Sequence, residues 1–329
     1  MNFAARSSTR PVGLAFRPAR PDELVTCAGI WRTSINDYIG RLGQDEIPRE
    51  INPVIRLFVH LQATDPQRFI VAVAPPTDDE QADSERIVAF ASAAIRESLW
   101  YLSMLFVLPE SQRDGLGREL LAHVLPSDDR MARATATDSA QPVSNALYSK
   151  YGITPRMPML NLTGLPVRPD AFGALPSGVV PIPFDELAAG PPDGQGHRAL
   201  VDAIDDLDRE VLGVAHPMDH RFLRTESRRG WLYRGPDGTP VGYGYAGEAG
   251  RVGPVAVQDD ALLAPVLGHL TSAVQPRGAF AMWIPGGADR ALVAALQAGF
   301  RLDQFPVLLC WDRPFGDFSR YLPISPGLL

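Results

Sequence analysis

Leu105 to Val124 reads LFVLPESQRDGLGRELLAHV and contains the strand, turn and helix that decide the fold. The strand stops at Pro109, which has no N–H group for a neighbouring strand. Gly115 and Gly117 then open a helix whose apolar residues recur at helical spacing. Glycines allow a tight turn and the close approach of a ligand, and the first amides of a helix have no intrahelical partner. The stretch therefore predicts a pyrophosphate-binding helix start.

Two common phosphate loops do not fit this stretch. A dinucleotide-binding GxGxxG would need a glycine at Leu120, and a P-loop would need a lysine, but the only lysine of the chain is Lys150. The pattern (Gln/Arg)-x-x-Gly-x-(Gly/Ala) does fit, at Gln112, Gly115 and Gly117. It resembles the acetyl-CoA pyrophosphate loop of the GNAT superfamily of N-acetyltransferases.

A second segment, LYSKYGI at residues 147–153, strengthens this resemblance. It is similar to the GNAT stretch Leu-Tyr-x-x-x-Gly-Phe, in which the tyrosine commonly protonates the leaving CoA thiolate. A phenol is a proton donor at neutral pH, so Tyr148 suits this role. The alternative is a tyrosine that only packs at the end of a helix terminated by Gly152.

The resemblance implies that a primary amine attacks the thioester of acetyl-CoA directly, without an acyl-enzyme. Tyr148 is then the catalytic acid. The residues expected to contact acetyl-CoA are Leu105, Phe106, Val107, Gln112, Arg113, Asp114, Gly115, Leu116, Gly117 and Arg118. The general base is not identified: the alternatives are a water relay or one of Glu97, Asp37, Glu46 and His60.

The composition is that of a globular protein. It lacks the excess of basic residues that is typical of proteins that bind nucleic acid or anionic membranes. The 329 residues are 45% apolar and 21% charged, with a net charge of −7. The N-terminal residues do not resemble a signal peptide, and no stretch approaches a membrane span. Two separated cysteines form no metal or redox pattern. We expect a cytoplasmic protein that acts on a small-molecule or peptide amine, and a homodimer is left open.

The order of predicted elements indicates an α/β (α+β) fold of two tandem GNAT-like domains, each a mixed, mainly antiparallel twisted sheet flanked by helices. We expect the catalytic domain at 1–165, a Pro/Gly-rich linker at 166–195 and a second domain at 196–329. The second domain has Gln258-Asp-Asp-Ala261 at the loop position, where carboxylates would repel a pyrophosphate. Ala295 aligns with Tyr148. This half is therefore expected to be degenerate, as in actinobacterial-type tandem acetyltransferases.

The sequence leaves two other functions open. One is a non-catalytic acyl-CoA sensor or scaffold, and the other is a tandem acetyltransferase of the mycothiol-synthase kind. His216 and His220 have a spacing conceivable for metal binding, but no further ligands cluster nearby in the sequence. We expect them to lie in a loop or to contact substrate, and we predict no metal site.

Overall fold

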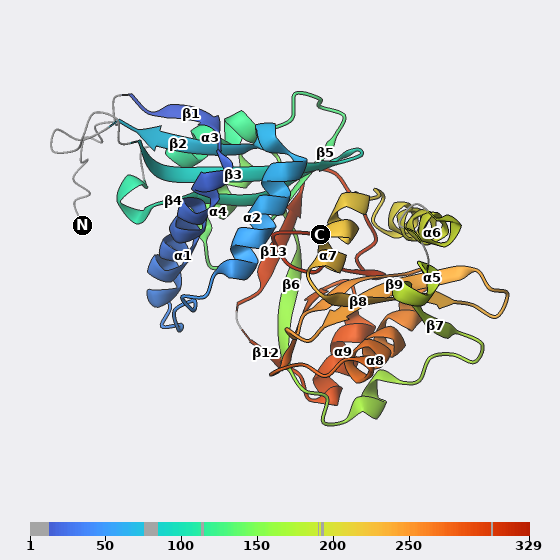
Figure 1. Cartoon of the computed structure of the whole chain (residues 1–329). Coiled ribbons are helices and arrows are strands. Elements are labelled where there is room, and N and C mark those ends of the chain that lie inside the picture. The colour runs from blue at the N-terminus through green and yellow to red at the C-terminus, as the bar shows by residue number, and fades with distance from the viewer. Residues whose placement is uncertain (1–12, 76–84, 113–114, 190, 192–193, 304) are drawn as a thin grey trace. The chain divides into compact units, whose positions relative to one another are not determined.

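The chain folds into two compact units. The first consists of Met1–Ile95 with Trp100–Asp129, and the second of Arg96–Leu99 with Arg130–Leu329. The computed structural model describes residues 13–75, 85–112, 115–189, 191, 194–303 and 305–329 (Figure 1). Both units combine helices with sheets whose described strand pairs are antiparallel, which confirms the predicted mixed fold class.

The strands of the first unit follow the order β1-β2-β3-β4, and its helices are α1, α2 and α3. Its elements are β1 (Ala15–Pro18), α1 (Leu24–Gly40), α2 (Asn52–Thr64), β2 (Phe69–Ala74), β3 (Arg86–Arg96), β4 (Leu99–Val107) and α3 (Leu116–Val124), with short 3-10 turns at Pro21–Glu23, Pro66–Arg68 and Pro109–Ser111. The acidic loop that the sequence suggests at 77–85 lies almost wholly outside the described residues.

Aromatic side chains fix α2 on the sheet of the first unit. Phe58 of α2 meets Phe69 of β2 and Phe90 of β3 edge to face, with ring centroids 5.6 and 5.2 Å apart. All three side chains are fully buried. Each such pair contributes about 0.5–1.5 kcal/mol beyond the area that it buries. The apolar side chains of these two strands and of α2 therefore meet in one core.

The second unit contains more elements and two sheets. Its helices are α4 (Pro142–Ser149), α5 (Phe184–Leu187), α6 (Gln195–Val211), α7 (Pro217–Thr225), α8 (Leu263–Ala273) and α9 (Asp289–Ala298), with 3-10 turns at Pro169–Phe172 and Asp260–Leu262. Its strands are β5 (Ala132–Asp138), β6 (Thr154–Gly164), β7 (Val180–Pro183), β8 (Arg228–Arg234), β9 (Pro240–Gly247), β10 (Val252–Val257), β11 (Phe280–Pro285), β12 (Arg301–Leu302), β13 (Val307–Trp311) and β14 (Tyr321–Leu322).

Strands from distant parts of the sequence alternate in the first of these sheets, whose order is β5-β13-β6-β11 (Figure 1). β13 lies between β5 and β6, so that Cys310 faces Thr135 on one side and Pro155 on the other. An ion pair fixes this register, because Arg133 donates from its backbone and side chain to Asp312 at 2.9 and 2.8 Å. The last part of the chain thus completes a sheet built from residues 132–164.

This exchange of strands explains why the units do not coincide with the halves of the sequence. Residues 130–164 pack with the C-terminal residues because β13 and β11 pair with their strands. The range 166–195, predicted as a linker, contains β7, which pairs with β8 and forms the edge of the second sheet, β14-β10-β9-β8-β7. The end of the catalytic domain at residue 165 is predicted from the resemblance between the two halves of the sequence. It stays a prediction.

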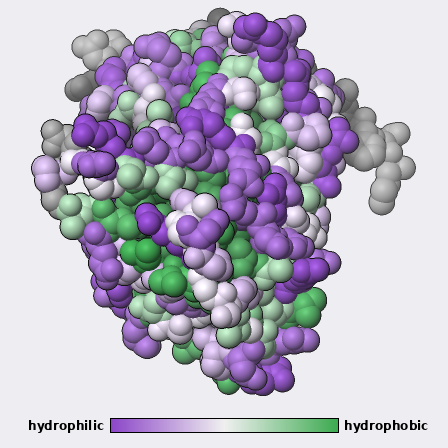
Figure 2. Space-filling model, turned by 90° about the vertical axis from the view of Figure 1, so that its right-hand side faces the viewer, coloured by the Kyte–Doolittle hydropathy of each residue, from purple (hydrophilic) through white to green (hydrophobic). Residues whose placement is uncertain are grey.

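A large apolar core lies in the second unit, between its sheets and the helices α8 and α9. Leu267 and Leu270 of α8 are fully buried there, together with Ala295 of α9. Figure 2 shows one face of the molecule, on which apolar patches are interrupted by hydrophilic residues. Among the described residues, none of the helices has both the length and the apolar character that crossing a membrane requires.

Candidate functional site

The end of β4 carries the residues for which contacts with the pantetheine arm are predicted. Leu105, Phe106 and Val107 are its last residues and are half-buried. The Val107 carbonyl accepts hydrogen bonds from the Ser34 hydroxyl of α1 and from the Gln112 side-chain amide, each at 3.0 Å. Gln112 thus fixes the strand end through its side chain, and the loop leaves β4 in a defined direction.

The helix α3 begins with a glycine in the left-handed conformation. Gly115 is the N-cap residue and has a φ of +79°, which other residues rarely adopt. Its carbonyl accepts hydrogen bonds from the N–H groups of Arg118 and Glu119, at 3.0 and 3.1 Å. The amides of Leu116 and Gly117 therefore precede the first intrahelical bond and are available at the helix start.

A cationic side chain adds to the positive end of this helix. The Nη2 atom of Arg118, an exposed residue, lies 3.6 Å from the position that a Cβ on Gly115 would occupy. Both the guanidinium and the helix dipole favour an anion at this point. Arg113 and Asp114, which are also predicted to contact acetyl-CoA, lie outside the described residues.

The rest of α3 is anchored firmly to the first unit. Leu116, Leu120, Leu121 and Val124 are all buried, as their helical spacing predicts. At the C-terminal end, the indole N–H of Trp100 donates to the Val124 carbonyl at 2.8 Å. The helix start is thus presented by a rigid element, which is a requirement for a preformed binding site.

Tyr148 lies near the end of α4 in the second unit. The start of this helix is tied to β5, because the Asn145 amide donates to the carbonyls of Asp138 and Gln141 at 3.0 and 2.8 Å. Tyr148 is buried, and burial, followed by the neighbouring Cys310 thiol, raises the pKa of its phenol well above the ordinary value. The phenol is therefore protonated at neutral pH and can donate a proton.

The backbone at the end of α4 matches the predicted glycine stop. Gly152 has a φ of +80°, and the N–H of Ile153 donates to the Tyr148 carbonyl at 3.1 Å. A packed helix-end tyrosine and a proton donor are both compatible with this geometry. The structure brings the predicted loop residues 105–107, 112 and 115–118 together in the first unit and assigns Tyr148 to the second.

The three carboxylates among the candidate general bases, Glu97, Asp37 and Glu46, are engaged with cations or backbone groups. Glu97 accepts hydrogen bonds from Arg209 at 2.9 and 3.0 Å and from the Ala215 N–H at 3.2 Å, all in the second unit. In the first unit, Asp37 and Glu46 each pair with an arginine near the surface. These carboxylates have structural partners, which disfavours them as proton acceptors for a substrate.

The corresponding helix start of the C-terminal half has a different chemistry. Asp259 caps the 3-10 turn before α8, and its side chain accepts a hydrogen bond from the Ala261 N–H at 2.9 Å. Asp260 follows in the first turn and lies 3.4 Å from the Arg290 guanidinium. At the position that aligns with Tyr148, Ala295 is fully buried in the core. A carboxylate of the chain thus already satisfies an amide of this helix start.

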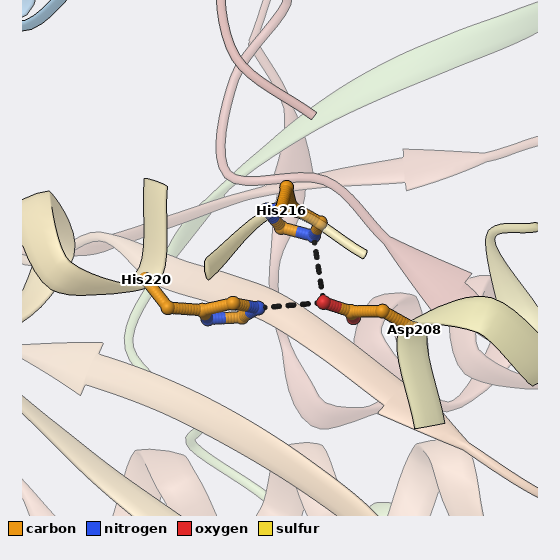
Figure 3. Close-up of side chains that lie close together, drawn as sticks. All are labelled: Asp208, His216 and His220. Atoms are coloured by element: carbon orange, nitrogen blue, oxygen red, sulfur yellow. Dashed lines mark hydrogen bonds and ion pairs between the residues drawn. The ribbon is translucent and has the colours of Figure 1, made fainter. Parts of the chain in front are cut away.

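His216 ends the loop between α6 and α7, as expected, whereas His220 lies inside α7, which corrects the expectation of a loop for that residue. His216 is the N-cap residue of α7 and His220 lies one turn later. Both are buried, and both face Asp208 of α6 (Figure 3). The nearest atoms are Asp208 Oδ2 with His220 Nε2 at 2.8 Å and with His216 Nε2 at 3.2 Å. The sequence missed Asp208 because it lies on the preceding helix.

Burial and mutual interaction both act on the pKa values in this cluster. Burial alone would raise the pKa of Asp208, but the two histidines hold it well below its usual range. Burial also lowers the pKa of each imidazole, while Asp208 opposes this effect; the pKa of His216 ends above its ordinary value and that of His220 below it.

Comparison with known proteins finds one family model that matches part of the chain. Residues 80–166 match the family model described as Acetyltransferase (GNAT) domain. No curated protein sequence matches the chain. The matched range contains β4, the described loop residues, α3 and the Tyr148 helix.

Solved structures resemble the chain over nearly its whole length. An acetyltransferase candidate from Pyrococcus horikoshii aligns over 100% of both chains with 15% identity and a TM-score of 0.70. A GCN5-related N-acetyltransferase from Sphaerobacter thermophilus aligns over 95% of this chain and 100% of its own, with 19% identity and a TM-score of 0.58. A tandem GNAT protein from the clavulanic acid biosynthesis pathway aligns over 91% and 97%, with 16% identity and a TM-score of 0.52.

Proposed function

We propose that the chain is an N-acetyltransferase that uses acetyl-CoA, because residues 80–166 match the GNAT domain model and the chain resembles the fold of a tandem GNAT protein. The family and the fold support acyl transfer in general. The finer assignment covers the acetyl donor, a primary amine on a small molecule or peptide as acceptor, and a single cofactor site in the N-terminal half.

The start of α3 is the observation that carries this proposal. The left-handed Gly115, the amides of Leu116 and Gly117 and the guanidinium of Arg118 surround one point at the positive end of the helix. Donors in this arrangement fit the oxygens of a diphosphate. A side chain at position 115 would be strained and would fill part of this space.

Transfer of the acetyl group then depends mainly on positioning and on one proton donor. The thioester of acetyl-CoA supplies the activated acetyl group, and the amine acceptor attacks its carbonyl carbon directly. The amide groups at the end of β4, from Leu105 to Val107, would orient the pantetheine arm as an added strand does. As the C–S bond breaks, Tyr148 would give its phenolic proton to the departing sulfur, and the proton that the attacking nitrogen loses would pass through water and restore the phenol.

The donor site is tested by shortening the ligand to S-acetylpantetheine, which lacks the diphosphate together with the nucleotide. Calorimetry of the whole chain should show that S-acetylpantetheine binds far more weakly than acetyl-CoA. Equal affinities would mean that the start of α3 is only a turn. A screen of small amines, antibiotics and peptides, read by the release of free CoA, then identifies the acceptor. Acetyl-CoA binding without release of CoA across the panel would favour the sensor function over the transferase.

A further inference from the structure

The cluster of Asp208, His216 and His220 combines the donor types that bind a borderline divalent metal ion. One carboxylate oxygen and two imidazole nitrogens lie within 4.8 Å of one another, and all three residues are buried. His216 and His220 are four residues apart, at the start of one helix, and their rings stack with centroids 4.4 Å apart. The donors thus come from two helices and converge on one point (Figure 3).

Two of the three separations between the donor atoms are close to those of a tetrahedral site, and the third, between the two imidazole nitrogens, is within 4.8 Å. With Zn–N and Zn–O bonds near 2.0–2.1 Å, neighbouring ligand atoms lie about 3.3 Å apart. The Asp208 Oδ2 atom lies 3.2 Å from His216 Nε2 and 2.8 Å from His220 Nε2. An ion would therefore fit after an opening of about half an ångström on the His220 side.

The remaining atom of each donor side chain has an outer partner. His220 Nδ1 lies 3.0 Å from the Tyr245 hydroxyl, and the other oxygen of Asp208 accepts a hydrogen bond from Tyr243. His216 Nδ1 makes no hydrogen bond, yet it lies 3.6 Å from a carboxylate oxygen of Asp219. Metal-binding histidines commonly direct their second nitrogen to such a carboxylate or hydroxyl group.

The outer partners are themselves held in place. Asp219 makes a two-pronged ion pair with Arg96, with both N–O distances at 2.7 Å. The hydroxyl of Tyr321 lies 3.4 Å from His216 Nε2, which makes it a candidate for a further ligand. Arg96, Asp219 and Tyr321 are buried too, so the cluster is enclosed by polar groups in an otherwise apolar core.

From these contacts we propose that Asp208, His216 and His220 bind one divalent transition-metal ion, of which Zn²⁺ is the best match. The two imidazoles and the carboxylate suit zinc and, with open positions, also ferrous iron. The burial of the site gives the ion a structural role: it fastens α6 to the beginning of α7. All three residues belong to the second unit, and none of them is among the residues proposed to bind acetyl-CoA or to donate the proton.

The metal content of the whole chain is the first test. The protein is expressed in zinc-supplemented medium, analysed by mass spectrometry for bound metals, stripped with a chelator and titrated with Zn²⁺ against a chromophoric competitor. We expect one ion per chain with a Kd below about a micromolar, and a lower Tm after stripping. Titration with Co²⁺ should give the visible absorption of a low-symmetry site.

Variants then locate the ion. His220→Gln should abolish high-affinity binding, while Tyr245→Phe, which keeps the ring but removes the outer partner, should raise the Kd about 10–100-fold. The matched control is His197→Gln, which changes a histidine of α6 that lies outside the cluster. If His220→Gln does not fold, the Kd of Tyr245→Phe and the wild-type stoichiometry still show whether the cluster binds the ion.

Two results would overturn the proposal. The first is a stripped wild-type chain that takes up neither Zn²⁺ nor Co²⁺ and whose Tm is insensitive to both, in which case the three side chains form a hydrogen-bonded network only. The second is wild-type affinity in both folded variants, which would place the ion elsewhere in the chain.

Discussion

The starts of α3 and α8 show how the same local structure can accept or reject an anion. Both helices follow a strand and a short loop. At α3 a left-handed glycine leaves the amides of Leu116 and Gly117 available and places Arg118 beside them. At α8 the carboxylate of Asp259 already accepts the hydrogen bond of an amide, and Asp260 adds a second negative group. The residues at the cap, rather than the fold, decide what such a helix start can bind.

The same contrast holds for the later helices α4 and α9. Tyr148 presents a protonated phenol near the end of α4, whereas Ala295 in α9 has only a methyl group in the core. If both helices only filled space, the hydroxyl of Tyr148 would be dispensable. Substitutions at Tyr148 and at the two helix starts can test both contrasts.

Tyr148→Phe should slow acetyl transfer by about 10²–10⁴-fold, because the ring stays and only the proton donor is lost. The loss should affect kcat and kcat/KM together, since the proton moves only as the thiolate leaves. Affinity for acetyl-CoA should be unchanged, as calorimetry can show. Tyr151→Phe, three residues later, serves as the control.

Dependence on the leaving group sharpens this prediction. Acyl donors with a more acidic thiol need less protonation, so the defect of Tyr148→Phe should shrink with them. Wild-type rates in the variant, measured with the true acceptor, would falsify the acid assignment and leave water as the proton source. A lower Tm with normal turnover would indicate a tyrosine that only packs.

Gly117→Glu should lower the affinity for acetyl-CoA by well over tenfold. The new carboxylate would stand where the diphosphate is expected, and losing one charge-assisted hydrogen bond costs about 1.5–3 kcal/mol. Stability should not fall, because glutamate is a better helix former than glycine by about half a kcal/mol. Calorimetry and thermal unfolding measure both effects.

A matched glycine separates charge from position in this experiment. Gly40 lies at the exposed end of α1, and a Cβ there would meet nothing within 4 Å. Gly40→Glu adds the same charge to the same unit and should leave the affinity unchanged. Equal affinities in the two variants would remove the contrast between the helix starts.

The sequence predicted what local patterns determine. The strand predicted to stop at Pro109 and the helix predicted to start at Gly115 are observed as β4 and α3, and Gly115 and Gly152 have the positive φ angles that their predicted roles require. In each case the information lies within one short segment, where propensity, turn chemistry and burial agree.

Other features depend on contacts between distant segments. The insertion of β13 between β5 and β6 leaves no periodic signal, because pairing is set by the assembled sheet. The helix α7 was missed because His-Pro-Met-Asp-His was interpreted as a loop, although Pro217 at the first helical position is a helix-start signal. Asp208 could be joined to the two histidines only once α6 and α7 were seen side by side.

One acetyl-CoA molecule should bind per chain. The start of α3 offers amides and a cation, whereas Asp259 and Asp260 would repel a diphosphate at α8. Calorimetry of the whole chain should therefore give a stoichiometry near one, and Gly117→Glu should abolish that single event. Two equivalent sites per chain would contradict the view that the C-terminal half has lost cofactor binding.

Asp259→Ala should produce the smallest effect, a loss of about 1 kcal/mol in the free energy of unfolding, because the helix start loses its capping carboxylate. Asp260→Ala should cost less, since that carboxylate makes only a surface pair with Arg290 at 3.4 Å. Denaturant unfolding measures both, and the acetyl-CoA stoichiometry should stay at one. A second acetyl-CoA bound by Asp259→Ala would show that a single carboxylate, and not the absence of the glycine loop, keeps the C-terminal helix start from binding an anion. The comparison between α3 and α8 would then rest on one side chain.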